Sequence, residues 1–216
     1  PNVGKSTVFN ALTGMNQHTG NWPGKTVATA QGTHTYKGTD YILVDLPGTY
    51  SLMAHSPEEA VARDFLCFGG ADAAVVVCDA TCLERNLNLA LQVAEASPRM
   101  VLCVNMMDEA RSRGMDVDIE LLERLLGLPV VGIAARNRQG LDRLKQRVEE
   151  AAAARASAQT ASALLLSYPK AVEQAQSVIA QQIQKAVPAI ESAGTARFAA
   201  LRAMTGDDGF LARLLS

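Results

Sequence analysis

The chain begins Pro1-Asn2-Val3-Gly4-Lys5-Ser6-Thr7 (PNVGKST), and this stretch decides how the fold is interpreted. Glycine-lysine-serine ends a phosphate-binding loop, whose full pattern is glycine, four variable residues, glycine, lysine and then serine or threonine. Counted back from Gly4, the first glycine of that pattern would fall two places before Pro1. The pattern therefore predicts a phosphate-binding loop of which this chain holds the second part.

The residues after the loop fit a helix, as a phosphate-binding loop requires. Apolar side chains at Val8, Phe9 and Leu12 give one apolar face to a helix over Ser6 to Leu12. Backbone N–H groups at such a helix start attract phosphate oxygens, while Lys5 would reach the outer phosphates and the Ser6 hydroxyl would bind magnesium. A glycine-lysine-serine triplet alone is common by chance, so motifs elsewhere in the chain must show whether it belongs to a phosphate-binding loop.

Two further motifs each follow a predicted strand. Asp45-Leu46-Pro47-Gly48 follows the strand Tyr41 to Val44, where a carboxylate can hold magnesium and a glycine lets the backbone approach the terminal phosphate. Asn105-Met106-Met107-Asp108 follows the strand Met100 to Val104, and its carboxylate can accept two hydrogen bonds from guanine that adenine cannot offer. Since ligands of α/β sheets bind at the carboxyl ends of strands, the order and placement of all three motifs predict a guanine-nucleotide site.

Composition excludes several classes of protein. A chain of 216 residues can hold one ordinary domain and a small second one. Its net charge of −2 and the absence of a basic run argue against a nucleic-acid partner. The apolar runs, such as Ala73 to Cys78, are far shorter than the roughly 18 residues of a membrane helix, which predicts a soluble chain without a signal peptide. Cysteines at Cys67, Cys78, Cys82 and Cys103 show no zinc spacing and are interpreted as reduced core thiols.

Apolar periodicity alternates between strands and helices as far as residue 150, which predicts an α/β fold with a mostly parallel sheet between helices. Gly38, Thr39 and Asp40 are interpreted as a hairpin turn, so one pair of strands is expected to be antiparallel. The expected strands are Thr33–Tyr36, Tyr41–Val44, Ala73–Cys78, Met100–Val104 and Val130–Ile133. The expected helices are Pro57–Phe68, Glu84–Ala96, Ile119–Leu126 and Leu141–Ala152.

The composition changes after Glu150, where an alanine-rich run leads to Tyr168-Pro169 and is interpreted as a linker or connecting helix. Helical spacing of apolar residues resumes at Val172, and Pro188 is expected to start a last helix that ends near Met204. We therefore expect a G domain over residues 1–150 and a small all-helical domain over residues 151–216.

These motifs, GKST, DLPG and NMMD, resemble the first, third and fourth guanine-binding motifs of small G proteins. The stretches GNWPGKTV (20–27), VDLPGTYSL (44–52) and CDATCLERNLNLALQV (78–93) resemble the cytosolic GTP-binding domain of the FeoB family of bacterial ferrous iron transporters. The resemblance is strong over about residues 1–150 and looser over the helical part. It implies a Ras-like G domain followed by a helical domain, on the cytoplasmic side of the bacterial inner membrane.

The resemblance also implies a role for individual residues. Thr26, in the first switch loop, would bind magnesium and sense the terminal phosphate, as Asp45 and Gly48 would in the second switch. Asn105 and Asp108 would read guanine, and Ala134-Ala135 stands where the family has Ser-Ala behind the base, so the hydroxyl is lost and faster nucleotide exchange is expected. The residues that would surround the phosphates of GTP or GDP are Asn2, Val3, Gly4, Lys5, Ser6 and Thr7.

Slow hydrolysis is expected, because Thr49 stands where Ras-like enzymes have the glutamine that orients the attacking water. The residues assigned to catalysis are Asn2, Lys5, Thr26, Gly48 and Thr49. Asn2 matches the asparagine that helps potassium-activated G proteins to hold K⁺ beside the phosphates, although it could instead cap the loop. The lone tryptophan, Trp22, could sense the nucleotide or anchor its own loop.

Several alternatives stay open. One is a soluble potassium-dependent GTPase of tRNA modification or ribosome assembly, and another is a nucleotide-switched binding module with little turnover. The resemblance implies an attached transmembrane iron-transport domain as partner and leaves open a homo-oligomer formed through G domains. A chain without the first strand and first loop glycine is expected to expose its sheet and to bind phosphate more weakly.

Overall fold

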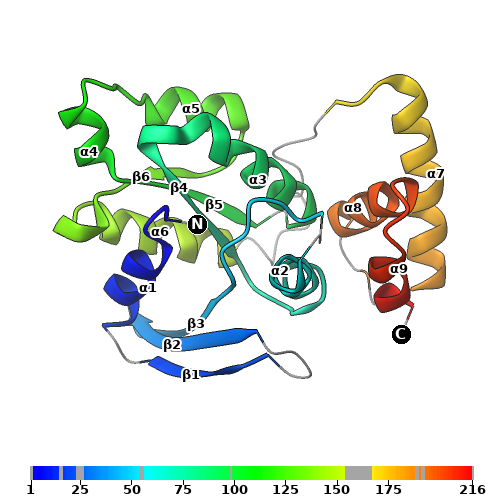
Figure 1. Cartoon of the computed structure of the whole chain (residues 1–216), viewed down its shortest axis with the longest axis horizontal. Helices are drawn as coiled ribbons and strands as arrows, with labels where there is room; N and C mark the ends of the chain where they lie inside the picture. The colour runs from blue at the N-terminus through cyan, green and yellow to red at the C-terminus, as the bar shows by residue number, and fades with distance from the viewer. Residues whose placement is uncertain are drawn as a thin grey trace.

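The computed structural model describes residues 2–14, 17–22, 27–53, 56–97, 99–153, 167–187, 190 and 193–215. Strands and helices alternate through the first two thirds of these residues, and helices alone follow (Figure 1). The predicted α/β class with a parallel sheet, flanking helices and a helical addition is confirmed. Residues 150 and 151 both lie inside one helix, and the boundary between a G domain and a helical domain stays a prediction.

Strands β1 (Gln17–Asn21), β2 (Ala28–Tyr36) and β3 (Thr39–Asp45) form an antiparallel sheet in the order β1-β2-β3. The turn between β2 and β3 lies at Lys37 and Gly38, whose φ angles are 49° and 80°. Two consecutive positive φ values are typical of a tight two-residue hairpin, which matches the right-handed twist of the strands. The turn was expected over Gly38 to Asp40, but it begins one residue earlier, because Thr39 and Asp40 pair with β2.

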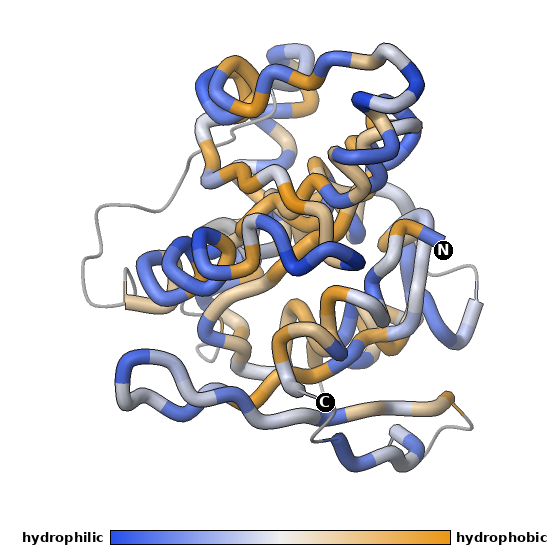
Figure 2. The backbone as a smooth tube through the Cα atoms, turned by 90° about the vertical axis from the view of Figure 1, so that its left-hand side faces the viewer, coloured by the Kyte–Doolittle hydropathy of each residue, from blue (hydrophilic) through white to orange (hydrophobic). Residues whose placement is uncertain are grey.

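Strands β4 (Ala74–Asp79), β5 (Met100–Asn105) and β6 (Val130–Gly132) form a parallel sheet with β5 in the middle. Every residue of β5 is buried, because helices cover both faces of this sheet. Met100, Leu102 and Val104 belong to one apolar core, whereas Val101 and Cys103 belong to the other. The alternation has the period of two that a strand imposes, and Figure 2 shows the hydrophobic residues gathered toward the interior.

The helices of this part begin and end at local signals. Ser56 accepts a hydrogen bond from the Glu59 N–H at 3.2 Å, and Pro57 is the first residue of its helix. Asp118 caps the start of α5 by accepting from the Leu121 N–H at 2.8 Å. The α-helices are α1 (Lys5–Thr13), α2 (Pro57–Phe68), α3 (Leu83–Ala96), α4 (Met107–Ser112), α5 (Ile119–Leu126) and α6 (Leu141–Ala153). Short 3-10 helices are η1 (Ala80–Cys82) and η2 (Ala135–Asn137).

Helices α7 (Lys170–Ala186), α8 (Ala193–Met204) and α9 (Asp208–Leu214) pack together beside α2 and α3 (Figure 1). Phe198 and Phe210 are fully buried between them, with ring centroids 5.9 Å apart. Phe210 also stacks on Phe68 of α2 at 5.5 Å. Because these rings belong to the same core as β4 and β5, the C-terminal helices share an apolar core with the sheet.

Some expected elements were misplaced and others were missed. β1 (Gln17–Asn21) was not predicted, since its polar residues show no apolar alternation, and neither were α4 and α9. β2 begins at Ala28, five residues before the expected strand, because pairing with β1 extends it. The alanine-rich run after Glu150 begins inside α6, which ends at Ala153, and residues 154–166 lie outside the described residues, as does the helix start expected at Pro188.

The interpretation of all four cysteines as core thiols is wrong for Cys82, which is exposed. Cys78 and Cys103 are buried and Cys67 is partly buried. Burial raises the pKa of the Cys67 and Cys78 thiols to about 12 each, so both stay protonated. Within the described ranges, no helix is both long enough and apolar enough to cross a membrane.

Candidate nucleotide-binding site

The opening stretch forms the turn into α1. Gly4 is the residue before the helix and has a left-handed backbone with φ 77°, which glycine adopts without strain. Its carbonyl accepts from the Val8 N–H at 3.0 Å, so Lys5, Ser6 and Thr7 form the first helical turn. Asn2 also has a positive φ, 66°, and is exposed. The predicted phosphate-binding residues therefore surround a helix N-terminus, where backbone N–H groups favour anions.

Lys5 and Asp45 come together although 40 residues separate them. Asp45 is the last residue of β3, and its carboxylate oxygen Oδ1 accepts from the Lys5 ammonium. The two side chains are partly buried, with 34% and 20% of their surfaces exposed. This contact joins the first predicted motif to the DLPG motif, in which Gly48 follows as an exposed residue.

Asn105 connects the first motif to the last. Its side-chain nitrogen donates to the Val3 carbonyl at 3.1 Å, and its side-chain oxygen accepts from the Ala135 N–H at 3.0 Å. Asn105 is 3% exposed, so both halves of the buried amide are paired, as burial demands. A Cβ at Gly4 would collide with the Asn105 amide, so only glycine fits this approach. Asn105 was expected to read guanine, and here it holds the two loops together.

Asp108 lies at the start of α4, where Met106 has a left-handed backbone and the Met107 N–H donates to the Ile133 carbonyl at 3.1 Å. The Asp108 carboxylate accepts from the Asn137 side-chain amide at 2.8 Å in an exposed position. Asn137 belongs to η2, in the loop of the fifth motif. The fourth and fifth motifs are therefore joined by a surface hydrogen bond as well as by Asn105.

Ala134 and Ala135 are buried at the start of η2. Ala134 exchanges two backbone hydrogen bonds with Gln139, at 3.1 and 3.2 Å, which close the loop between β6 and α6. Gly140 has a φ of 78°, and a Cβ there would lie 2.7 Å from the Gly132 carbonyl. The loop backbone is thus fixed without the serine hydroxyl that the family pattern has at position 134.

The segment after Gly48 is held by several side chains. The Thr49 hydroxyl lies 2.5 Å from the Ser51 carbonyl and 3.2 Å from a Glu59 carboxylate oxygen, and it accepts from the Ser51 N–H at 3.0 Å. Gln92 of α3 accepts from the Leu52 N–H at 2.7 Å. The expected catalytic residue Thr49 is therefore engaged within its own loop.

Trp22 directly follows β1. The backbone N–H of Trp22 donates to the Val27 carbonyl at 2.8 Å, and its ring makes an edge contact with the ring of Phe65 on α2, with centroids 5.2 Å apart. An anchoring role for Trp22 is consistent with this contact. Thr26, predicted to bind magnesium, lies outside the described residues, as do Pro23, Gly24 and Lys25.

Three residues contribute to the site without having been predicted to do so, two of them through side chains and one through its backbone. Asn137 holds Asp108, Gln92 holds the segment after Gly48, and Gln139 closes the loop between β6 and α6 through its backbone. No spacing in the sequence marks Asn137 or Gln92, because each contacts its partner only after distant elements have packed. Asn137 and Gln139, two and four residues beyond Ala135, could have been searched as part of that loop.

The residues present fit a nucleotide with its magnesium ion. A left-handed Gly4 next to a helix N-terminus, an adjacent lysine and a strand-end carboxylate offer N–H donors, a cation and oxygen ligands. Ser6 supplies a hydroxyl on the exposed face of the first turn. Among the described residues there is no cluster of three His, Cys, Asp or Glu side chains that could hold a metal ion without other ligands.

Sequence comparison shows what the chain is similar to. The family model described as ferrous iron transport protein B matches residues 1–148. The Fe(2+) transporter FeoB of Campylobacter jejuni is 40% identical over 148 residues, which are 68% of this chain and 24% of that protein. The FeoB of Salmonella typhimurium is 39% identical over 153 residues, 69% of this chain and 20% of that protein. The chain thus spans no more than about a quarter of the length of these relatives.

Solved structures agree with this similarity. The cytosolic domain of the T. maritima FeoB iron transporter in a GDP form is 36% identical, with a TM-score of 0.84 and coverage of 100% of this chain and 82% of that chain. The cytosolic domain of L. pneumophila FeoB is 35% identical, with a TM-score of 0.82 and coverage of 100% and 89%. Because the family model matches more than half of its residues, the chain belongs to the ferrous iron transport protein B (FeoB) family.

Proposed function

We propose that this chain binds GTP and GDP with Mg²⁺, hydrolyses GTP slowly and regulates the passage of ferrous iron through an attached membrane domain. The observation that carries the nucleotide part is the convergence of the first, third, fourth and fifth motifs through Lys5–Asp45 and through Asn105. Family membership and the GDP form of the T. maritima relative support the same ligand.

Guanine selectivity would come from Asp108, whose carboxylate would exchange its bond to Asn137 for the N1–H and amino group of the base. Two charge-assisted hydrogen bonds lost together lower affinity by roughly 100-fold. Titration with fluorescent GDP, competed with GTP or ATP, should show this loss in Asp108→Ala and none in Asp116→Ala, which changes an exposed carboxylate elsewhere. Equal competition by GTP and ATP in the native chain would contradict the proposal.

The phosphates and Mg²⁺ would require Lys5 and Asp45 to exchange their mutual contact for contacts to the ligand. Lys5 would then meet phosphate oxygens, while Ser6, Thr26 and Asp45 would hold Mg²⁺ directly or through water. The ion would neutralise charge that develops on the phosphates during hydrolysis. Lys5→Ala should therefore weaken GTP binding strongly, and removal of Mg²⁺ with EDTA should weaken GTP binding in the native chain.

Hydrolysis would depend on groups other than a glutamine, since the Thr49 hydroxyl is bonded inside its loop. Asn2, exposed beside Gly4, is proposed to help to hold a K⁺ ion next to the phosphates, where its charge would serve as an arginine finger does in other G proteins. Phosphate release from GTP should be faster in KCl than in NaCl, and Asn2→Ala should remove the difference. Equal rates in the two salts would exclude the potassium role.

The iron-transport part rests on the relatives, of which this chain spans only a fraction. The DNA that encodes this chain should also encode several apolar runs of roughly 18 or more residues. In cells that depend on the longer protein for iron, Lys5→Ala should reduce uptake of ⁵⁵Fe²⁺ under anaerobic conditions. Unchanged uptake in a variant that no longer binds GTP would separate transport from nucleotide binding.

A nucleotide-switched binding module with little turnover is the second candidate. The hydrogen bonds of the Thr49 hydroxyl to its own loop favour it, because they occupy the side chain nearest to the expected position of the attacking water. A single-turnover assay decides between the candidates, since a module of this kind would hold GTP for hours without releasing phosphate. A role in tRNA modification or ribosome assembly is disfavoured by the family match.

A further inference from the structure

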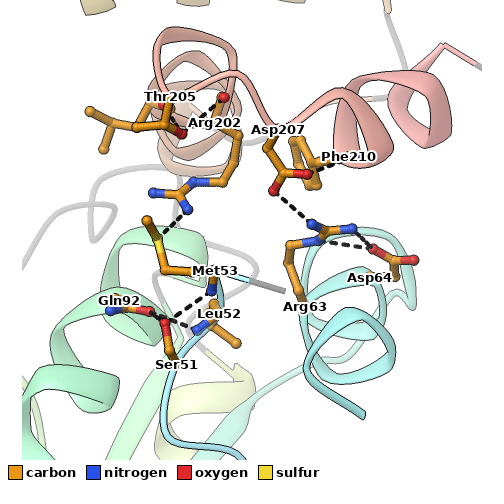
Figure 3. Close-up of polar contacts among 11 residues, drawn as sticks. Ser51, Leu52, Met53, Arg63, Asp64, Gln92, Arg202, Thr205, Asp207 and Phe210 are labelled. Carbon is orange, nitrogen blue, oxygen red and sulfur yellow. Dashed lines mark hydrogen bonds and ion pairs between the residues drawn. The ribbon is translucent and has the colours of Figure 1, made fainter. Parts of the chain in front are cut away.

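One amide side chain of α3 holds the segment that follows the DLPG motif. The Gln92 oxygen Oε1 accepts from the Leu52 N–H at 2.7 Å and from the Ser51 hydroxyl at 3.2 Å (Figure 3). The Ser51 hydroxyl oxygen in turn accepts from the Met53 N–H at 3.0 Å. Three consecutive residues are therefore tied, directly or through one hydroxyl, to a single oxygen atom.

Gln92 is itself held in place by the helix that carries it. Its neighbours on α3, Ala90, Val93 and Ala96, are buried in the core against the parallel sheet. Leu52 is 1% exposed in the same core, so the bonded segment lies against a packed surface and not in open solvent. A side chain on a packed helix loses little further conformational freedom when it forms these hydrogen bonds, so it can hold the segment after Gly48 in one position.

The bonds lead back to the residues that would act on GTP. Ser51 donates its N–H to the Thr49 hydroxyl at 3.0 Å, and Thr49 directly follows Gly48. Because Thr49 supplies no amide side chain to orient water, the backbone around Gly48 must be positioned by something else. Misplacement of a reacting group by about 1 Å can slow a reaction by roughly 100-fold.

We propose that Gln92 is a positioning residue for GTP hydrolysis, which fixes the backbone of the second switch segment through Ser51 and Leu52. This inference rests on the proposed GTPase function and adds to it a residue outside every recognised motif. Gln92 acts through the loop and does not touch the nucleotide. Its loss should therefore slow the chemical step and leave nucleotide affinity almost unchanged.

The test compares Gln92→Leu, Gln92→Glu and Asn88→Ala in this protein, with Asn88 as an exposed position one turn earlier on α3. Gln92→Leu removes the acceptor, and its single-turnover rate of GTP hydrolysis should fall roughly tenfold, with GDP affinity within twofold of native. Gln92→Glu keeps an oxygen that can accept both bonds, so its rate should stay near native. Asn88→Ala should match the native protein in rate and affinity.

A second measurement follows the loop directly. Hydrogen exchange of the Leu52 amide should accelerate in Gln92→Leu and remain slow in Gln92→Glu and Asn88→Ala. A Gln92→Leu variant that hydrolyses GTP at the native rate overturns the inference, as does one that loses GDP affinity in the same proportion as rate. If Gln92→Leu melts below the assay temperature, Ser51→Ala removes only the hydroxyl link and should slow hydrolysis by a smaller factor.

The two levels of the proposal can be told apart. Native protein that binds GTP but never releases phosphate would defeat the proposed GTPase activity, and with it the positioning role. In that case the exchange rate of the Leu52 amide still shows whether Gln92 holds the segment. Native protein that hydrolyses GTP while Gln92→Leu does so equally well would leave the GTPase standing and remove Gln92 from it.

Discussion

Asn105 shows how much one buried side chain can organise. Its amide pairs its nitrogen with Val3 and its oxygen with Ala135, which are 102 and 30 residues away in sequence. Replacement by leucine would leave a carbonyl and an N–H without partners, and each unpaired buried group costs about 1–3 kcal/mol. The amide therefore fixes the relative position of these two loops.

Ala134 gives a prediction at the same scale. Serine at this position restores the hydroxyl of the family pattern, and we expect GDP to leave Ala134→Ser severalfold more slowly than it leaves the native chain. Ala134 is 3% exposed, so the new hydroxyl must find a partner near the nucleotide or destabilise the loop. Stopped-flow release of fluorescent GDP measures the rate, and equal rates would contradict the prediction.

Trp22 gives a second prediction, because it is the single tryptophan of the chain. Its ring contacts Phe65, while the first switch stretch continues directly from it. Binding of the GTP analogue GMPPNP should therefore change its fluorescence emission more than binding of GDP. The variant Phe65→Leu should reduce this difference, since it removes the ring that Trp22 meets. An emission spectrum that is identical with both nucleotides would show that Trp22 is an anchor only.

At the scale of elements, α3 joins the two parts of the molecule. One face is buried against the sheet, Gln92 reaches the second switch segment, and Glu95 accepts from the Tyr168 hydroxyl at 2.9 Å. Tyr168 comes just before α7, and burial together with the bond to Glu95 raises its pKa to about 12. The helix thus contacts the segment that leads into the C-terminal helices as well as the segment that leads out of β3.

Glu95 makes folding stability depend on pH. Burial raises the pKa of its carboxyl above the ordinary 4.5, although the Tyr168 hydrogen bond and the charge of Arg197 oppose this shift. The folded state therefore holds the proton more tightly, and the stability from Glu95 is full below about pH 4.5 and is lost as pH rises through the raised pKa. Glu95→Gln should avoid this loss, because an amide oxygen still accepts from Tyr168.

Thermal unfolding measures this effect. Glu95→Gln should have a higher Tm than the native chain at pH 7 and the same Tm at a pH below the ordinary value for glutamate. Asp116→Asn, at an exposed position, should follow the native chain at both pH values. A lower Tm for Glu95→Gln at pH 7 would show that attraction to Arg197 and Arg202 outweighs the cost of burial.

At the scale of the whole molecule, the C-terminal helices contact α2 and the segment after the DLPG motif through charged side chains (Figure 3). Arg63 of α2 donates to Asp207 at 2.7 Å and lies over the Phe210 ring, 4.9 Å from its centroid. Arg202 of α8 lies over Phe198 and donates to the Met53 sulfur. Burial lowers the pKa of the Arg202 guanidinium, which marks it as a cation withdrawn from water.

The Arg63–Asp207 pair should therefore contribute to stability across the two parts. The Arg63 side chain is 4% exposed, and Asp207→Asn would leave its charge poorly paired, which should lower the free energy of unfolding by about 2 kcal/mol. The asparagine can still cap α9, as Asp207 does by accepting from the Phe210 N–H at 3.0 Å. Urea unfolding measures the change, with the exposed Asp208→Asn as control.

A double-mutant cycle separates the pair from other effects. Arg63→Gln and Asp207→Asn should each destabilise, and the double variant should lose less than the sum of the two single losses. Additive losses would show that Asp64, which also accepts from Arg63 at 2.9 Å, is the partner that matters.

The sequence alone determined where most of the helices and the strands of the parallel sheet lie along the chain. The alternation of β4, β5 and β6 with helices, the start of α2 at Pro57 and the ends of α5 at Ile119 and Leu126 follow from periodicity and from capping residues a few positions away. Family membership followed from three motifs and the stretches between them. Periodicity and capping depend only on residues a few positions apart in the sequence, so they can be recognised without the tertiary structure.

Tertiary structure decided the rest. β1 is a strand only because β2 pairs with its polar residues, and the hairpin turn lies at Lys37 because the register of β2 and β3 requires it. The contacts of Lys5 with Asp45, Asn105 with Val3 and Gln92 with Leu52 join residues 40 to 102 positions apart. Periodicity fixes which face of an element is apolar, but only the packing of those faces determines which polar side chains meet at their edges.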